Sequence, residues 1–251
     1  MLKDIDLEKI VTIAKKASDA IMQIYKTDFT VNHKEDNSPL TEADTKANEI
    51  ICSQLEKLYP NIPIISEENK QIEYETRQKW KYYWCIDPID GTKEFIKKNG
   101  EFTINIALIH KNTPILGVVY APVIDEIYKA KKGEGAFKNG ERLPLKTNKH
   151  PKEKLHVVAS KSHLSKETQE FINRLETKEI EQITKGSSLK LCMVATGEAD
   201  IYPRLAPTME WDTAAADAIV RETSKMTYQF DTGIPLVYNK KNLLNPWFVV
   251  K

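Results

Sequence analysis

Hydrophobic residues recur at helical spacing in several parts of the chain. From residue 4 to 25 they fall on every third or fourth position, which predicts an amphipathic helix. A second helix is expected over 41–59, because Thr41 followed by Asp44 resembles a capping box. Further helices are expected at residues 92–96, 165–176, 189–196 and from 210 onward.

Apolar runs between these helices predict strands. Residues 102–110 and 114–122 alternate and are joined by a short polar segment, which indicates an antiparallel hairpin. Asn139-Gly140 favours a second tight hairpin turn. The remaining strands are expected at residues 29–34, 62–66, 80–86, 126–130, 155–159, 179–184, 199–204, 235–238 and 243–250. This order predicts an α+β protein with an antiparallel sheet in its middle.

Composition narrows the classes of partner. Lys and Arg number 37 against 36 Asp and Glu, so the net charge of +1 provides no global field for a nucleic-acid polymer or a membrane. The three cysteines are widely spaced and form no disulfide framework, which fits a reducing compartment. No apolar signal core or transmembrane run is found. We expect a cytoplasmic protein, with peripheral association with the inner face of the membrane left open.

The segment 84–95 is the first candidate for chemistry. An apolar run is expected to break at Asp87-Pro88, because Pro88 cannot donate to a strand ladder. Gly91 permits a sharp turn, and Thr92 can begin a short helix. Two carboxylates, Asp87 and Asp90, with a nearby carbonyl suit a hard cation such as Mg2+, and free N–H groups suit a phosphate. The alternative is a plain turn, since these are common turn residues.

Three other acidic positions have two interpretations each. Glu67 and Glu68 end a strand, where acids are usually solvated, although a cation would relieve their repulsion. Asp44 lies at a helix start and could act only as a cap. Asp212 lies in the first turn of a helix and could merely complement its dipole.

Basic and polar candidates for anion binding lie in the second half. Gly186 and Ser187 precede a helix N-terminus, and Lys190 lies about one turn further on. The alternative is that a serine here caps the helix. Arg204 suits bidentate phosphate binding, but a surface ion pair explains it nearly as well. Ser160-Lys161-Ser162-His163 follows a strand, and His163 could be an exposed loop histidine.

Two segments carry a resemblance to a known family. Asp-Pro-Ile-Asp-Gly-Thr at 87–92 and Trp-Asp-Thr-Ala-Ala at 211–215 resemble the two signatures of the inositol monophosphatase superfamily, in the expected order. The longer stretch WCIDPIDGTKEFIKKNGEFTIN, residues 84–105, is similar to the CysQ-type 3'(2'),5'-bisphosphate nucleotidase branch. The resemblance covers nearly the whole chain. It implies a layered α-β-α-β-α sandwich of the inositol monophosphatase and sugar phosphatase type.

The resemblance also implies roles for individual residues. Two or three Mg2+ ions are expected, with Glu68 a weaker ligand than the others. The implied metal ligands are Glu67, Asp87, the Ile89 carbonyl, Asp90 and Asp212. The implied catalytic residues are Asp44, Glu67 and Thr92. The implied substrate-binding residues are Gly91, Thr92, Ser160, His163, Gly186, Ser187, Lys190, Arg204 and Asp212.

The implied activity is Mg2+-dependent, lithium-sensitive hydrolysis of the 3'-phosphate of adenosine 3',5'-bisphosphate, a reaction connected with sulfur assimilation. The partner would be a small phosphorylated substrate, and the protein a monomer or homodimer. Residues 1–150 are expected to hold the metals and residues 151–251 most of the nucleotide pocket. One departure is the segment 221–225, which lacks the Gly-rich turn of many relatives.

Three alternatives compete with this hypothesis. An inositol monophosphatase or sugar bisphosphatase would use the same scaffold. A non-catalytic nucleotide or metal sensor is disfavoured by the presence of all the expected acids and Thr92. A structural or interaction protein is not supported, since the chain has no repeats, coiled coil or low-complexity arm.

Overall fold

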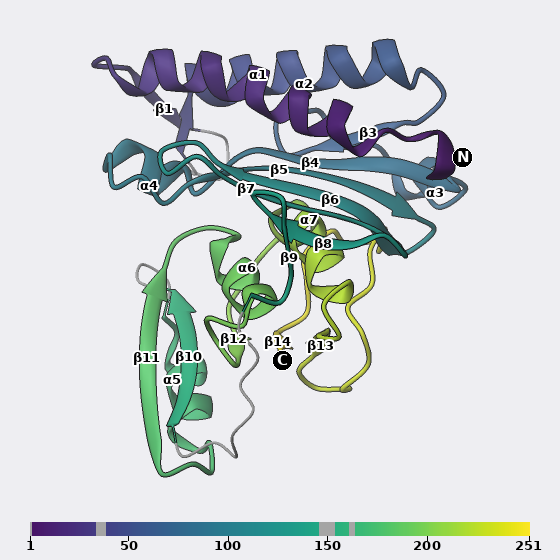
Figure 1. The fold of residues 1–251 in the computed structure, drawn as a ribbon. Coiled ribbons are helices and arrows are strands. Elements are labelled where there is room, and N and C mark those ends of the chain that lie inside the picture. The colour runs from purple at the N-terminus through teal and green to yellow at the C-terminus, as the bar shows by residue number, and fades with distance from the viewer. Residues whose placement is uncertain (1, 34–38, 146–153, 161–163) are drawn as a thin grey trace.

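A computed structural model describes residues 2–33, 39–145, 154–160 and 164–251. Figure 1 shows alternating layers of helices and sheets. A helix pair, α1 (Leu7–Tyr25) and α2 (Glu42–Leu58), covers one face of the larger sheet. Helices α6 (Leu189–Thr196) and α7 (Glu210–Arg221) lie beyond its other face, followed by a smaller sheet and α5 (Lys166–Asn173). The expected layered α+β architecture is confirmed.

The larger sheet has seven strands in the order β3-β4-β5-β6-β7-β8-β9. Only the pair β3·β4 is parallel, and the rest of the sheet is antiparallel. Its strands are β3 (Ile64–Ser66), β4 (Tyr82–Asp90), β5 (Thr103–His110), β6 (Thr113–Ala121), β7 (Glu126–Lys131), β8 (Gly135–Lys138) and β9 (Glu141–Arg142). Both expected hairpins form, and Asn139 and Gly140 at the β8–β9 turn have φ of 48° and 88°.

Alternating side chains explain why this sheet lies between two helical layers. In β4, Trp84 and Ile86 belong to the hydrophobic core formed with α1 and α2. Their neighbours Tyr83 and Cys85 belong to the core formed with α6 and α7. Because successive side chains of a strand point to opposite faces, a continuous apolar run buries both faces of the sheet.

Helix α7 packs unusually close to β6. A Cβ atom on Gly117 would lie 2.1 Å from the carbonyl oxygen of Ala215 in α7. The neighbouring helical residues Ala214, Ala216 and Ala218 are also small and buried. Small residues on both elements therefore place the start of α7 directly against the sheet, which matters for the site because Asp212 lies in that first turn.

The first of two small sheets beyond α6 and α7 is part of a strand–helix–strand unit. Strands β10 (Lys154–Ser160) and β11 (Glu179–Lys185) pair in parallel, with α5 as the crossover. In β10, Val157 and Ala159 pack in a cluster with Ile172 of α5, whereas Val158 packs in the core that includes α6. A second small sheet has the order β12-β14-β13, formed by Tyr202–Arg204, Phe248–Val250 and Thr227–Gln229.

The remaining elements are short: η1 (Leu2–Asp4), β1 (Val31–His33), β2 (Pro39–Thr41), α3 (Tyr74–Arg77) and α4 (Thr92–Ile96).

Two expectations about strands are wrong. The apolar run of β4 does not end at Asp87-Pro88 but continues to Asp90. The segment 235–238 forms no strand, because Pro235 lacks an N–H donor and makes only an isolated bridge to Tyr228. The nearby strand β13, over Thr227–Gln229, was not expected.

The chain leaves α7 through a turn that contains no glycine. Ser224 takes φ of 62°, a left-handed conformation that glycine adopts more readily. The hydroxyl of Thr223 donates to the carbonyl of Val220, at 2.7 Å, and helps to close the helix. The division expected near residue 150 lies outside the described residues and stays a prediction.

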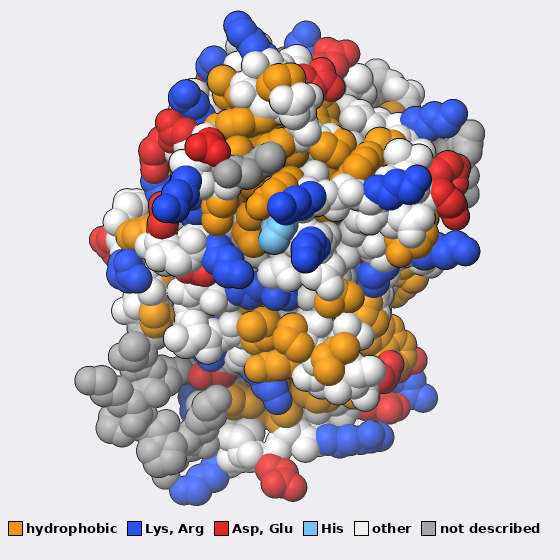
Figure 2. Space-filling view, turned by 90° about the vertical axis from the view of Figure 1, so that its right-hand side faces the viewer, with side chains coloured by type: hydrophobic (Ala, Val, Ile, Leu, Met, Phe, Trp, Pro, Cys, Tyr) orange, Lys and Arg blue, Asp and Glu red, His pale blue; other side chains and the backbone are white. Residues whose placement is uncertain are grey.

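The surface carries charges of both signs. On the face in Figure 2, lysine side chains gather around a histidine, with hydrophobic side chains between them and acidic ones toward the edges. Burial lowers the pKa of His110, and so do the nearby Lys111, Lys81 and Lys132. His110 pairs with Tyr82 where β4 begins, at the other end of that strand from Asp87. No helix in the described part of the chain is long and apolar enough to cross a membrane.

Candidate active site

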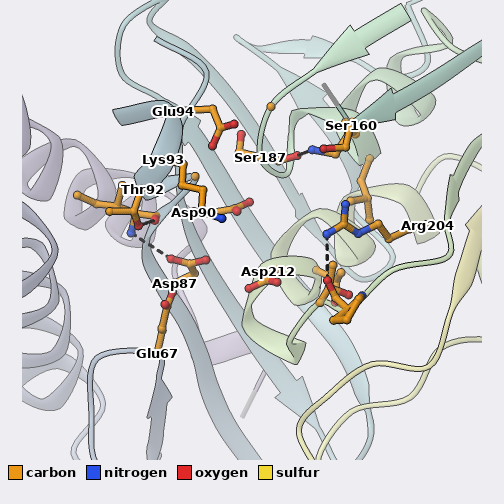
Figure 3. Close-up of a pocket in the computed structure, with 18 of the residues that line it drawn as sticks. Glu67, Asp87, Asp90, Thr92, Lys93, Glu94, Ser160, Ser187, Arg204 and Asp212 are labelled. Carbon is orange, nitrogen blue, oxygen red and sulfur yellow. Dashed lines mark hydrogen bonds between the residues drawn. The ribbon is translucent and has the colours of Figure 1, made fainter. Parts of the chain in front are cut away.

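A cavity of about 300 Å³ is lined by residues from two parts of the chain, 67–94 and 160–248. Figure 3 shows Glu67 and side chains of β4 and α4 on one wall and side chains of α7 and β12 on the other. The lining residues are Glu67, Asp87, Ile89, Asp90, Gly91, Thr92, Lys93, Glu94, Ser160, Gly186, Ser187, Lys190, Leu191, Tyr202, Arg204, Pro207, Thr208, Asp212, Thr213 and Phe248.

A β-bulge aligns the two carboxylates of β4. Asp87 pairs with Asn105 of β5 and Asp90 pairs with Thr103, so three steps on β4 match two steps on β5. In a regular strand, residues three apart would point to opposite faces. The extra residue turns Asp90 to the same face as Asp87, and the bulge accommodates Pro88, which has no N–H for the ladder.

The turn after β4 requires a glycine. Gly91 has φ of 94°, and a Cβ atom there would lie 3.3 Å from the carbonyl oxygen of Glu101. Helix α4 begins directly afterwards at Thr92. A single residue therefore separates the strand from the helix, and the start of α4 lines the cavity beside Asp90.

Thr92 and Asp44 form a hydrogen-bonded pair at the cavity wall. The Thr92 hydroxyl lies 3.3 Å from Asp44 Oδ1 and 3.3 Å from the carbonyl oxygen of Ile89. The other oxygen of Asp44 accepts from the Thr41 N–H at 2.8 Å and from the Thr41 hydroxyl at 2.6 Å. Asp44 is thus both a helix-capping carboxylate and a partner of Thr92, so its two expected interpretations are compatible.

Asp212 is arranged in the same way at the start of α7. One of its oxygens accepts from the N–H of Met209, at 2.9 Å, which caps the helix. Its side chain points across the cavity toward Asp87 (Figure 3). Glu67, directly after β3, completes the acidic lining. The starts of α2 and α7 therefore contribute Asp44 and Asp212, and the ends of β3 and β4 contribute Glu67, Asp87 and Asp90.

The buried acids of the cavity lie close enough together to raise one another's pKa, although Lys190 and Arg204 offset part of the effect on Asp90 and Asp212. Burial raises the pKa of Asp87, and the neighbouring Glu67, Asp90 and Asp212 raise it further. Burial also raises the pKa of Asp90 and of Asp212, for which Asp90 is the next largest cause. Such clustered carboxylates are stabilised by a cation, and oxygen donors are the ligands that Mg2+ prefers.

The acids surround the cavity rather than meeting at one point. Within the described ranges, no group of three or more acidic, histidine or cysteine side chains is arranged as a ready-made metal cluster. Mutual repulsion of the carboxylates favours such a separation. The donor set fits a divalent metal ion chemically.

The opposite wall is cationic. Lys190 is only 6% exposed, and its ammonium donates to the Ser187 carbonyl at 2.6 Å. Burial lowers the pKa of Lys190 to about 8; nearby Asp90 opposes this shift and Arg204 adds to it. Arg204 donates to the carbonyl of Pro207 at 2.9 Å, and its buried Nε–H has no partner among the described residues.

The loop between β11 and α6 is held tightly at this wall. The Gly186 N–H donates to Glu101 at 2.9 Å, and a Cβ atom on Gly186 would lie 2.6 Å from the Glu101 carbonyl oxygen. Ser187 takes φ of 45°, and its buried hydroxyl has no partner among the described residues. A strained serine with an unpaired hydroxyl beside Lys190 is typical of a place prepared for a polar ligand.

These features agree with comparisons to known proteins. Residues 5–246 match the inositol monophosphatase family. The chain belongs to this family.

Three relatives illustrate the similarity. The 3'(2'),5'-bisphosphate nucleotidase CysQ of Escherichia coli O6:H1 is 44% identical over 251 residues, covering 97% of this chain and 98% of that protein. The crystal structure of CysQ from Bacteroides thetaiotaomicron has 43% identity and a TM-score of 0.88, covering 98% of this chain and 96% of that one. The Thermotoga maritima IMPase structure has 28% identity and a TM-score of 0.76, covering 96% and 89%.

Most residues that the sequence singles out are brought together in this inositol monophosphatase fold. Twelve line the cavity: Glu67, Asp87, Ile89, Asp90, Gly91, Thr92, Ser160, Gly186, Ser187, Lys190, Arg204 and Asp212. Asp44 lies behind the wall and reaches it through Thr92. Glu68 is not among the lining residues. His163 lies outside the described residues.

Sequence reasoning missed several residues of the wall. Tyr202 and Phe248 supply an aromatic surface, and Lys93, Glu94 and Thr208 also line the cavity. Tyr202 could have been found from the sequence, since it shares the short strand Tyr202-Pro203-Arg204 with Arg204, a predicted phosphate-binding residue. The position of Phe248 depends on the pairing of β14 with β12, which no local pattern shows.

Proposed function

We propose that this chain is a Mg2+-dependent phosphomonoesterase that hydrolyses the 3'-phosphate of adenosine 3',5'-bisphosphate, giving AMP and phosphate. The observation that carries the proposal is one cavity in which acids from both walls lie together with the cationic Lys190 and Arg204. Such a cavity fits a substrate with two phosphates, one at the metal ions and one at the cations. The identity to CysQ nucleotidases supports this substrate.

The acids are the proposed metal ligands. Glu67, Asp87, Asp90, Asp212 and the carbonyl of Ile89 would together hold two or three Mg2+ ions. Bound Mg2+ supplies acidity to a water molecule and neutralises charge on the leaving 3'-oxygen.

The pair of Thr92 and Asp44 is proposed to orient the attacking water. The Thr92 hydroxyl lies 3.3 Å from both Asp44 Oδ1 and the Ile89 carbonyl oxygen; when it donates to Asp44, its oxygen can accept a hydrogen bond from water. The proton then moves through the hydroxyl to the Asp44 carboxylate, which is 1% exposed and held by Thr41. Glu67, which lines the same cavity, is the third proposed catalytic residue. The water attacks phosphorus in line with the 3'-oxygen, and no phospho-enzyme forms.

Backbone and cationic groups are proposed to bind the two phosphates. The N–H groups of Gly91 and Thr92, at the start of α4, would steady the phosphate that is cleaved. The nucleoside and its second phosphate would contact the opposite wall. The proposed contacts there are Ser160, His163, Gly186, Ser187, Lys190 and Arg204.

A substrate panel tests the proposal. Phosphate release is measured with adenosine 3',5'-bisphosphate, its sulfated analogue, inositol 1-phosphate and fructose 1,6-bisphosphate, with Mg2+ and with added Li+. We expect kcat/KM for the adenosine bisphosphate to exceed that for inositol 1-phosphate by at least about 100-fold, since a buried charge left without its partner costs about 3 kcal/mol. We also expect Li+ to inhibit.

Two results would replace the proposal. Faster release from inositol 1-phosphate or from the sugar bisphosphate would make the chain a phosphatase for that substrate on the same scaffold. Tight binding of adenosine bisphosphate with Mg2+ and no hydrolysis would make it a nucleotide sensor.

Location and assembly are further parts of the proposal. The three cysteines are free thiols, which fits a reducing cytoplasm. Either a monomer or a homodimer is compatible with a cavity built from one chain. Light scattering after size exclusion distinguishes the two, and cell fractionation tests the cytoplasmic location against peripheral membrane association.

A further inference from the structure

Ser188 lies behind the cavity and joins the two halves of the acidic site. Its side chain is 1% exposed. Its hydroxyl oxygen lies 2.7 Å from Asp90 Oδ2 and 2.7 Å from the backbone oxygen of Asp212. Asp90 comes 98 residues before Ser188 and Asp212 comes 24 residues after it. One hydroxyl therefore bridges two proposed metal ligands from distant parts of the chain.

A second buried residue orients that hydroxyl. The Asn105 amide nitrogen donates to Ser188 Oγ at 2.8 Å and lies 3.3 Å from Asp90 Oδ2. The Asn105 oxygen accepts from the Thr103 hydroxyl at 3.1 Å, which fixes which end of the amide faces Ser188. Thr103 and Asn105 are both fully buried. They are also the two β5 residues that pair with Asp90 and Asp87 across the bulge.

Counting donors shows that the hydroxyl is fully used. Ser188 has one proton to donate and two acceptors at equal distance, while its lone pairs receive the Asn105 amide. The network therefore holds Oδ2 of Asp90 in place. A carboxylate with one oxygen restrained has fewer orientations to lose on binding a metal ion.

The serine is not explained by helix capping. Ser188 occupies the cap position of α6, where serine usually accepts from a backbone N–H in the first turn. Here it has helical torsions, φ −64° and ψ −9°, and its side chain makes no capping hydrogen bond. The left-handed Ser187 before it turns the chain so that the Ser188 hydroxyl points at Asp90 and Asp212 instead.

We propose that Ser188, oriented by Asn105, is a positioning residue that holds Asp90 and sets its separation from Asp212, and so preorganises the divalent-cation site. The inference rests on the proposed function only in taking Asp90 and Asp212 as metal ligands. Hydrogen-bond partners of ligating carboxylates commonly contribute to metal affinity without touching the metal. Ser188 is expected to contribute to metal affinity in this way, because it links Asp90 on one wall to the backbone of Asp212 on the other.

Metal binding without substrate tests the inference. Mg2+ binding is measured by calorimetry, and Mn2+ binding by electron paramagnetic resonance, on wild type, Ser188→Ala, Ser188→Thr and Ser18→Ala. We expect Ser188→Ala to weaken binding by about 10- to 100-fold. Ser188→Thr keeps the hydroxyl and should recover most of the affinity. Ser18→Ala removes another buried serine, in α1, and should leave affinity unchanged.

Several outcomes would overturn the inference. These are wild-type affinity in folded Ser188→Ala, an equal loss in Ser18→Ala, or a threonine variant no better than the alanine one. If Ser188→Ala does not fold, Asn105→Ala provides the second measurement, and unchanged metal affinity there also overturns the inference. No nucleotide is used, so an error in the proposed substrate does not affect the result. A wild-type protein that binds no divalent cation contradicts the proposed function itself.

Discussion

Asp87 and Asp90 face the same side of β4 although they are three residues apart, because their partners on β5, Asn105 and Thr103, are only two residues apart. A bulge is therefore part of the site and not an irregularity of the sheet. It places two carboxylates side by side on a buried strand whose backbone cannot easily move.

Removing one of these charges should abolish turnover and leave the fold intact. For Asp90→Asn we expect kcat to fall by at least about 100-fold, the effect of losing one group that stabilises the transition state. Thermal unfolding should be little changed, because relief of carboxylate repulsion offsets the altered contact with Ser188. Asp19→Asn, at an exposed position of α1, is the control for a change of net charge. Near wild-type phosphate release from Asp90→Asn would show that Asp90 is not a metal ligand.

The hydroxyl of Thr92 is expected to matter more than its methyl group. Thr92→Ala removes the donor to Asp44 and should lower kcat by about 100- to 10,000-fold, the usual contribution of a positioned proton-transfer group. Thr92→Ser keeps the hydroxyl and should retain most of the activity. Steady-state kinetics at saturating Mg2+ separate kcat from KM. Equal activity of the alanine and serine variants would remove Thr92 from the mechanism.

Lys190 should select for the second phosphate. For Lys190→Met we expect kcat/KM for adenosine 3',5'-bisphosphate to fall by about 10- to 100-fold, since a charge-assisted contact contributes about 1.5–3 kcal/mol. Adenosine 3'-monophosphate has no second phosphate, so the same variant should hydrolyse it almost as wild type does. Exposed Lys97→Met, outside the cavity lining, is the matched control. An equal loss with both substrates would mean that Lys190 acts on the phosphate that is cleaved.

Gly117 should be a strong determinant of stability. Gly117→Ala places a Cβ atom 2.1 Å from the Ala215 carbonyl oxygen, so α7 must move away from the sheet. We expect the free energy of unfolding to fall by about 3 kcal/mol, at the upper end for overpacking. Gly133→Ala meets no atom within 4 Å but has φ of 80°, so it measures backbone strain alone, at about 1 kcal/mol. Urea denaturation compares them, and similar losses would contradict the steric explanation.

The sequence predicts much of the fold because the information is local. Apolar spacing over 4–25 and 189–196 marks α1 and α6, and Asn139-Gly140 marks a hairpin turn. Expectations failed where a distant partner decides the structure. Pro88 suggested a strand end, but pairing with β5 carries the strand through a bulge. The apolar segment at 235–238 has no full strand partner and forms only a bridge at Pro235.

The sequence alone determined which chemical groups are available: five acids, a threonine, a lysine and an arginine, of which three acids and the threonine lie in two recognisable signatures. Only the tertiary structure decided how they are arranged. The bulge that turns Asp90 toward Asp87, and the Ser188 hydroxyl that joins Asp90 to Asp212, both depend on contacts between residues far apart in the chain. Residue types and spacing are encoded locally, whereas directions of side chains in a site follow from register and packing between elements.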